Sequence, residues 1–233
     1  MTLTTANTAE SEQARIAFDR QSAGLRTAMP GIVQAVHANG TLDVQPAILQ
    51  VTTLNGVRRD VPLSVLSGVP TIFAYYAQSL GLSITLPLAP GDEGLLIVAD
   101  RSIDYWQVAG GVQAPVEPVS PRHHNLLDAL FLPGAISEPK AISAVADDAI
   151  QLRNRDASTH ITLGEDRVLL QVGSSILSVV EGFITLTAGG STLRIGSAVE
   201  VQSSGLSHNG IHVGDSHAHG GVTPGNGQTG PPR

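Results

Sequence analysis

The chain has 233 residues, including 25 glycines and 14 prolines, and only 3% are aromatic, so its interior depends mainly on Val, Leu, Ile and Ala. This composition favours short strands and tight turns over a helical enzyme. The absence of cysteine excludes disulfides, thiolate metal sites and cysteine nucleophiles, and the net charge of −7, with basic residues scattered along the chain, argues against nucleic-acid binding.

Residues 1–29 are predicted to form an N-terminal helix or extension. Helix-tolerant residues run from 9 to 28, and Pro30 ends the segment. Because the apolar face is ragged, both a solvated helix and a helix docked on a neighbouring subunit remain open. Residues 1–5 lack the basic region and apolar run of a signal peptide, so we expect synthesis in the host cytoplasm without one.

Residues 30–112 are predicted to form a small barrel. Apolar runs at 32–36 and 42–49 flank the turn 37–40 and predict a hairpin, and runs at 57–66, 82–86 and 95–98 predict three further strands. Five strands fit a closed barrel of the OB type. Asp92 and Glu93 lie in the turn between two strands. Adjacent turn residues point apart, so these two carboxylates are expected to shape the turn rather than act as an acid–base pair.

Residues 113–141 are predicted to form a connector. Its proline-rich stretch at 117–121 is expected to be stiff and extended, and a short helix is expected over 125–131. His123 and His124 come just before this helix. Neighbouring histidines do not easily bind one metal together, and no nucleophile accompanies them, so we interpret them as polar residues that open the helix.

Residues 142–213 contain short alternating strands separated by turns. Eight segments have this pattern: 150–152, 161–163, 168–172, 176–177, 184–186, 193–195, 199–201 and 211–213. Each has one apolar face, and the chain has no helix or long loop to cover it. We therefore expect a homotrimer in which three chains form an intertwined β-helix or triangular β-prism around a shared axis.

Residues 214–233 are predicted to form a metal-binding apex. In extended backbone, His217 and His219 point to the same side, roughly 6.5–7 Å apart. One chain does not complete a metal site with this pair, but three copies on an axis supply six imidazole nitrogens, which suit an octahedral metal such as iron better than tetrahedral zinc. A disordered tail that happens to contain two histidines is the alternative, because glycine and proline are abundant here.

Two stretches resemble a known family. His217-Ala218-His219-Gly220-Gly221-Val222, followed by Gly230-Pro231-Pro232, resembles the C-terminal tip of the central spikes of contractile-tailed phages and related particles, the baseplate spike or assembly protein V class. Residues 95–106, together with 122–134, are similar to the barrel and adaptor region of the small, lysozyme-free branch.

The resemblance implies an all-β homotrimer with an N-terminal OB-type barrel, a β-helix or β-prism, and one iron ion per trimer bound by His217 and His219. It implies docking to tail hub or tube proteins through the N-terminal half. It also implies a place at the tip of the tail baseplate in a virion, or in an equivalent extracellular contractile particle. The expected function is mechanical perforation of the bacterial outer membrane.

Two other functions were weighed. A trimeric receptor-binding fibre tip, or adhesin, predicts exposed aromatic residues near the end of the chain, but the last aromatic residue is Phe183. A metalloenzyme requires an open coordination position and a nearby general base, whereas six imidazoles fill all the coordination positions of an octahedral metal. We therefore expect a structural protein and no enzymatic activity.

Overall fold

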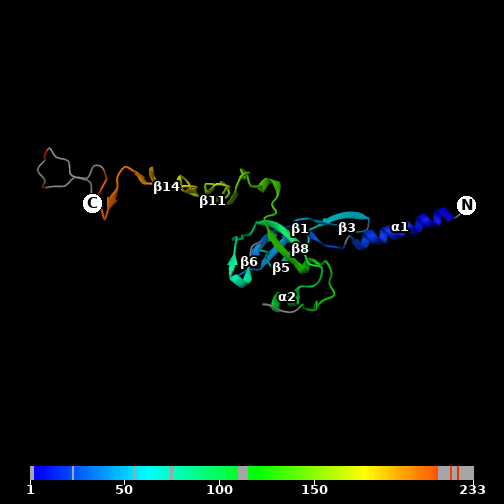
Figure 1. Cartoon of the computed structure of the whole chain (residues 1–233). Coiled ribbons are helices and arrows are strands. Elements are labelled where there is room, and N and C mark those ends of the chain that lie inside the picture. The colour runs from blue at the N-terminus through cyan, green and yellow to red at the C-terminus, as the bar shows by residue number, and fades with distance from the viewer. Residues whose placement is uncertain are drawn as a thin grey trace. The chain divides into compact units, whose positions relative to one another are not determined.

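The computed structural model describes residues 3–22, 24–54, 56–73, 76–109, 115–214, 221 and 225. Strands account for 44% of the chain and helices for 12%, which confirms the prediction of a mostly β protein. The chain divides into two compact units, Met1–Ala141 and Ile142–Arg233 (Figure 1).

The first unit is built on a five-stranded antiparallel sheet with the order β5-β2-β1-β8-β9. Its strands are β1 (Ala28–Val36), β2 (Leu42–Pro46), β5 (Leu66–Val69), β8 (Glu93–Val98) and β9 (Ala129–Pro133). The other elements are α1 (Leu3–Ser22), the hairpin of β3 (Gln50–Leu54) and β4 (Val57–Val61), β6 (Tyr76–Ala77), η1 (Gln78–Leu80), β7 (Leu82–Ser83), α2 (Asp104–Ala109), η2 (Leu126–Asp128) and η3 (Glu138–Lys140).

The five-stranded sheet curls into a half-barrel whose two edges meet. Phe131 of β9 donates its backbone N–H to the carbonyl of Pro70, just after β5, at 2.8 Å. Ile72 donates its N–H to the carbonyl of Phe131 at 2.7 Å. These bonds satisfy backbone groups of both edge strands at this point. The curl fits the expected small barrel, and the OB assignment itself stays a prediction.

The hydrophobic core of this unit fills the curled sheet. Phe131 is fully buried at its centre, and a Cβ on Gly94 would overlap the Phe131 ring and the carbonyl of Leu132. Glycine at 94 therefore lets the ring lie directly against strand β8. The buried apolar residues are Val33, Leu42, Val44, Leu66, Val69, Leu96, Val98, Ala129 and Phe131.

Several expectations for this unit need correction. The helix expected at 9–28 spans Leu3–Ser22, and Ala28 instead begins β1, where it pairs with Ile97 of β8. The strand expected at 57–66 splits around Pro62, and β4 pairs with β3 rather than with the main sheet. The run at 82–86 is a strand only at Leu82–Ser83.

The expected connector also contains a strand of the main sheet. A single 3₁₀ turn occupies Leu126–Asp128, where a helix over 125–131 was expected, and Ala129–Pro133 then pairs with β8. Ala129 and Phe131 of β9 are buried in the core, so strand pairing and burial decide the structure of this segment over the local sequence pattern. The hairpin expected around the turn 37–40 is confirmed, with a bulge between Val33 and Ala35.

The second unit is a seven-stranded antiparallel meander, in which each strand pairs with its neighbour in sequence. Its strands are β10 (Ile150–Arg153), β11 (Thr159–Leu163), β12 (Arg167–Val172), β13 (Ser175–Val180), β14 (Phe183–Ala188), β15 (Ser191–Ile195) and β16 (Val199–Gln202), followed by the small hairpin of β17 (Ser207–His208) and β18 (Ile211–His212). Every strand predicted between 150 and 213 is present. Gly189 and Gly190 both have positive φ, as a two-residue hairpin turn requires.

No helix in the described part of the chain is long and apolar enough to cross a membrane. The longest, α1, is polar on average, and Arg15 joins Glu12 and Asp19 on its surface by ion pairs of 2.7 and 3.0 Å.

Candidate functional site: an aliphatic sheet face and a polar clasp

One face of the seven-stranded sheet consists of two rows of aliphatic side chains. Directly paired residues and residues two apart along a strand share a face, so the strand register assigns these rows. Each of the seven strands contributes one residue to each row. The first row is Ile150, Leu163, Val168, Val179, Ile184, Ile195 and Val199, and the second is Leu152, Ile161, Leu170, Leu177, Leu186, Leu193 and Val201. We call these two rows the aliphatic face.

The aliphatic face is open to solvent in the single chain. All its residues except Leu177 and Leu193 are between 39% and 71% exposed. Among the described residues of this unit, only Thr162 is buried, and it lies on the opposite face. Among its described residues, the second unit therefore has no buried apolar core, in contrast to the first unit, and its aliphatic face forms a large exposed apolar patch.

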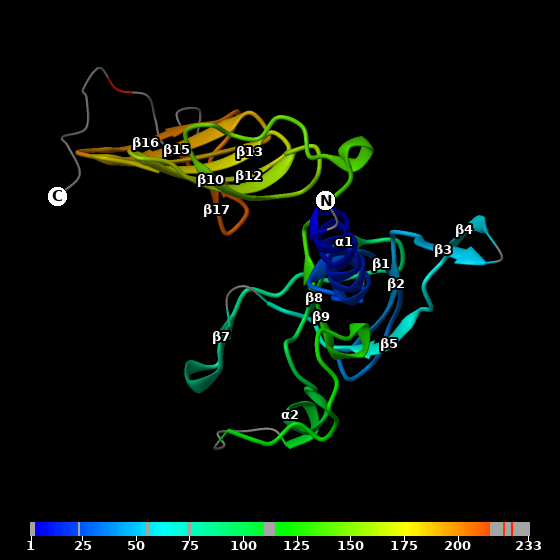
Figure 2. The ribbon, with the colours of Figure 1, turned by 90° about the vertical axis from the view of Figure 1, so that its right-hand side faces the viewer.

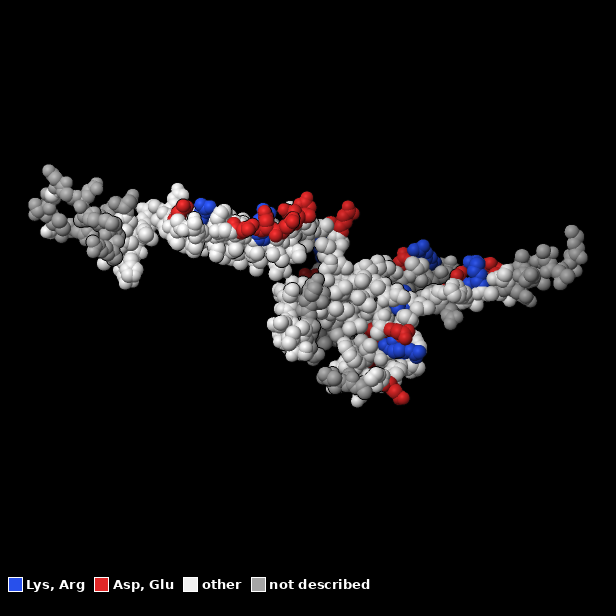
Figure 3. All heavy atoms as spheres, viewed as in Figure 1, with Lys and Arg blue, Asp and Glu red and all other residues white. Residues whose placement is uncertain are grey.

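The opposite face of the same sheet is polar. Gln151 donates to the Thr162 hydroxyl at 3.1 Å, and Arg194 lies 4.2 Å from the centroid of the Phe183 ring. The Arg194 guanidinium also approaches Glu200 at 3.6 Å. Figure 3 shows the charged side chains of this unit gathered along one side of it, with an uncharged surface beside them. Charged and aliphatic side chains of this sheet are thus separated onto different faces.

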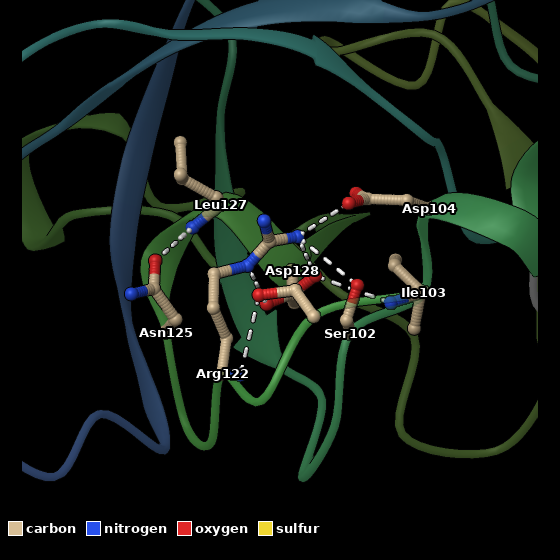
Figure 4. A network of polar contacts seen from close by, with 8 residues as sticks. Ser102, Ile103, Asp104, Arg122, Asn125, Leu127 and Asp128 are labelled. Atoms are coloured by element: carbon tan, nitrogen blue, oxygen red, sulfur yellow. Dashed lines mark hydrogen bonds and ion pairs between the residues drawn. The ribbon is translucent and has the colours of Figure 1, made fainter. Parts of the chain in front are cut away.

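A polar clasp in the first unit joins two segments near η2 (Figure 4). Asp128 is fully buried and accepts hydrogen bonds from Arg122 Nε at 2.9 Å, from Arg122 NH2 at 2.8 Å and from the Ile103 N–H at 3.1 Å. The same Arg122 nitrogen donates to Ser102 Oγ at 3.1 Å and to Asp104 at 2.8 Å. The clasp thus ties residues 102–104 to residues 122–128.

Hydrogen bonding dominates the electrostatics of the clasp. The Arg122 guanidinium holds the pKa of Asp128 below its usual range, and Asp128 and Asp104 together raise the pKa of Arg122. A buried carboxylate with bidentate arginine and backbone partners is stable as an ion but costly to leave unpaired. The arrangement therefore holds the base of a loop rather than presenting a free reactive group. Sequence reasoning did not find this pair, because nothing in the spacing of Arg122 and Asp128 marks them as partners.

Asp92 and Glu93 have structural partners, as expected of a turn. Asp92 accepts the Ala89 N–H at 2.7 Å and closes the turn. Glu93 accepts the Ser137 N–H at 2.6 Å and pairs with Lys140 at 3.0 Å. These contacts, the backbone N–H of Ser137 first, lower the pKa of Glu93 to about 2. The two carboxylates are held by different segments and do not face a shared site.

His123 and His124 also have partners within the chain. Arg101 lies 2.6 Å from His123 Nε2 and forms an isolated antiparallel bridge with that residue, and His124 Nε2 lies 3.2 Å from Asp100. His124 has a φ of 45°, so it makes a sharp turn rather than opening a helix. The two histidines thus pin residues 100–101 to the segment ahead of η2, beside the polar clasp.

The predicted metal ligands His217 and His219 lie outside the described residues. Among the residues that are described, no group of three or more His, Asp or Glu side chains is arranged to hold a metal ion. The metal site therefore stays a prediction from the sequence.

The curled sheet and its clasp lie in a region that matches a family model. Residues 29–134 match the family described as "Phage protein Gp138 N-terminal domain", and this range covers the five strands of the main sheet except the first residue of β1. The match supports a phage structural protein and suggests a component of the virion. A comparison with curated proteins gave no match.

Proposed function

We propose that the protein is the central membrane-piercing spike of a contractile tail, formed by three copies of this chain. The observation that carries the proposal is the aliphatic face, because a phage structural protein with an uncovered sheet face of this size needs identical or different chains to bury it. Its exposed apolar area is on the order of 1,000 Å² per chain, above the ~300–600 Å² of the largest patch on a typical monomer.

The free energy gained by burying the aliphatic face is sufficient to stabilise a permanent assembly. Burial of about 1,000 Å² at ~25 cal/mol per Å² gives about 25 kcal/mol per chain as an upper bound. Permanent homo-oligomers bury areas of this order on each subunit. A second copy of the chain is the occupant that matches best, because the rows are aliphatic along their whole length and carry no charge to specify a different partner.

The pairing of the strands favours a prism over an intertwined helix for this segment. Strands β10 to β16 find their hydrogen-bonding partners within one chain, so other chains are needed to cover the face rather than to complete the sheet. Three such sheets placed face to face form a triangular prism with two aliphatic side chains from each strand directed inward. The polar face, with Thr162, Arg194 and Glu200, is then directed outward.

The metal at the apex completes the proposal. Neutral imidazole nitrogens suit iron, and three copies of His217 and His219 provide the six donors of an octahedral site. Such a site is structural because its coordination is closed, which agrees with the proposal that the protein is not an enzyme. A bound metal supplies ordering free energy to a glycine- and proline-rich segment that cannot build a core.

The composition of the apex indicates how it is used. Residues 214–233 contain no Leu, Ile or Phe and end in Arg233, so spontaneous insertion into lipid is unfavourable. We therefore propose that the point is driven through the outer membrane by a contracting sheath and that the N-terminal half docks to the tail hub. The adhesin alternative lacks the exposed aromatic residues that a glycan-binding tip uses, because none follows Phe183.

The test compares particles that carry the full chain with particles whose spike ends before Gly214. Truncated particles are expected to assemble and contract normally but to penetrate target cells less well, and the isolated full-length protein is expected to leave intact vesicles unleaked at neutral pH. A matched control carries Ser203→Ala, which leaves the apex in place. Undiminished killing by normally assembled truncated particles, or strong spontaneous leakage, would contradict the piercing role.

A further inference from the structure

Two segments of the first unit leave the curled sheet, as the ribbon shows at β7 and α2 (Figure 2). The first, which we call the aliphatic arm, comprises residues 76–88 with β6, η1 and β7. It exposes Leu80, Leu82, Ile84 and Leu86 by between 47% and 73%. The second, the aromatic arm, comprises the described residues 99–109, which include α2, and 115–128. It exposes Tyr105, Trp106, Val108 and Val119 by between 49% and 79%.

Each arm is fixed at its base. Leu88 at the end of the aliphatic arm and Leu126 near the end of the aromatic arm pack against the core. The aromatic arm is also closed by the clasp of Arg122 and Asp128 and by a hydrogen bond of 2.9 Å from the Ala99 N–H to the Asp128 carbonyl. Firm attachment lowers the entropy that is lost when an exposed segment binds a partner.

Charge is absent from the aliphatic arm and from the outer part of the aromatic arm. The whole run from Val61 to Gly91, which includes the aliphatic arm, contains no Asp, Glu, Lys, Arg or His. In the aromatic arm the stretch from Tyr105 to Val116 is free of charged residues, whereas the base of the arm carries the charged groups of the clasp. Exposed loops normally carry charged side chains, whereas the cores of protein interfaces are depleted of charge and enriched in Tyr and Trp. The aliphatic arm and the outer part of the aromatic arm therefore have the composition of an interface core.

We infer that the aromatic arm of one copy packs against the aliphatic arm of the next copy around the three-fold axis. The inference rests on the trimer of the proposed function. A three-fold ring is held by heterologous contacts, in which two different patches of each chain meet. The first unit provides two such patches, one aromatic and one aliphatic, both uncovered within the described residues.

The areas of the two arms agree with such a contact. Each arm exposes roughly 450 Å² of apolar side chain, and the two together give roughly 900 Å². A standard interface buries about 1,600 Å², of which about 57% is apolar, or roughly 900 Å². The arms thus provide the apolar part of one standard-size interface per neighbouring pair, and Trp106 is placed as its anchor.

The absence of native cysteine makes the contact directly testable in the full-length protein. Leu82→Cys and Val108→Cys chains with different affinity tags are co-expressed and treated with a short bis-maleimide. Covalent dimers that carry both tags are expected, whereas either variant alone is expected to give few dimers. Val57→Cys, at the equally exposed β3–β4 hairpin, replaces Leu82→Cys in the control pair and is expected to give no mixed dimer.

Trp106, the sole tryptophan, provides a second measurement. In the trimer, the fluorescence emission of Trp106 is expected at a shorter wavelength than that of a solvent-exposed tryptophan. The side chain is also expected to be protected from quenching by acrylamide. Leu82→Asp is expected to remove this protection while the trimer persists through the aliphatic face.

The outcomes separate this inference from the proposed function. One outcome is a protein that sediments as a trimer, gives no mixed dimers and has a Trp106 that acrylamide quenches freely. This result overturns the contact between arms but not the trimer, and it assigns the arms to another partner such as the tail hub. A folded monomer overturns both.

Discussion

Replacing Leu186 with Asp should break the trimer. Leu186 lies in the middle of the aliphatic face, paired with Leu177 and Leu193, and is 48% exposed in the single chain. The exposed part of the side chain corresponds to about 90 Å², so its burial contributes about 2 kcal/mol per chain, or about 6 kcal/mol per trimer. Loss of this burial free energy alone weakens association of the three chains by about four orders of magnitude. The cost of desolvating three Asp carboxylates weakens it further.

The matched control is Thr185→Asp, one residue earlier in the same strand. Thr185 lies on the polar face and pairs with Arg194, so an added carboxylate there meets a positive partner and water. Sedimentation velocity at micromolar concentration should show Thr185→Asp as a trimer and Leu186→Asp as smaller species. If Leu186→Asp sediments like the unmodified protein, or if both variants dissociate alike, the aliphatic face is not the interface.

The remaining predictions concern the apex and the first unit. Changing His217 and His219 to Ala should reduce bound iron from about one ion per three chains to none, measured by elemental analysis of protein purified without a nickel column; unchanged iron would contradict the assignment. Asp128→Asn should lower the stability of the first unit by about 1.5–3 kcal/mol in thermal denaturation, because the hydrogen bonds from Arg122 lose their charged acceptor; an unchanged midpoint would mean that the clasp is not stabilising. Because the folded-state pKa of Glu93 is depressed to about 2, the stability from its contacts is present above the unfolded-state pKa and is lost as pH falls from about 4.5 towards 2. Glu93→Gln should reduce the loss of unfolding free energy over this pH range. An unchanged dependence of the unfolding free energy on pH would show that Glu93 does not cause it.

The second unit was predictable from its sequence because its structure is local. Alternation of apolar and polar residues marks each strand, and short turns force neighbouring strands to pair, so the register follows with no information from distant residues. The two aliphatic rows are a direct consequence of this register. The same pattern predicts an aliphatic face without a cover in the single chain, and the structure leaves that face exposed; the covering chains stay a prediction.

The first unit was less predictable because distant contacts decide its local structure. The run Ala129–Pro133 is short and apolar, a pattern that fits a buried helix or a buried strand equally well, and only pairing with β8 makes it a strand. Pro62 interrupts residues 57–66, for which the alternation of apolar and polar residues alone predicts a single strand. The clasp between Arg122 and Asp128 joins separate loops and leaves no periodic signal.

The neighbour-to-neighbour pairing of β10 to β16 also has a consequence for the order of events during biosynthesis. A meander has low contact order, so each hairpin can form as soon as its residues leave the ribosome. The sheet is then complete while its aliphatic face is still exposed. In the proposed trimer, association with identical chains therefore competes with non-specific aggregation. Translation of several copies from one messenger, close together in space, would favour the productive outcome, and a yield that falls when chains are expressed singly at low density would reveal this race.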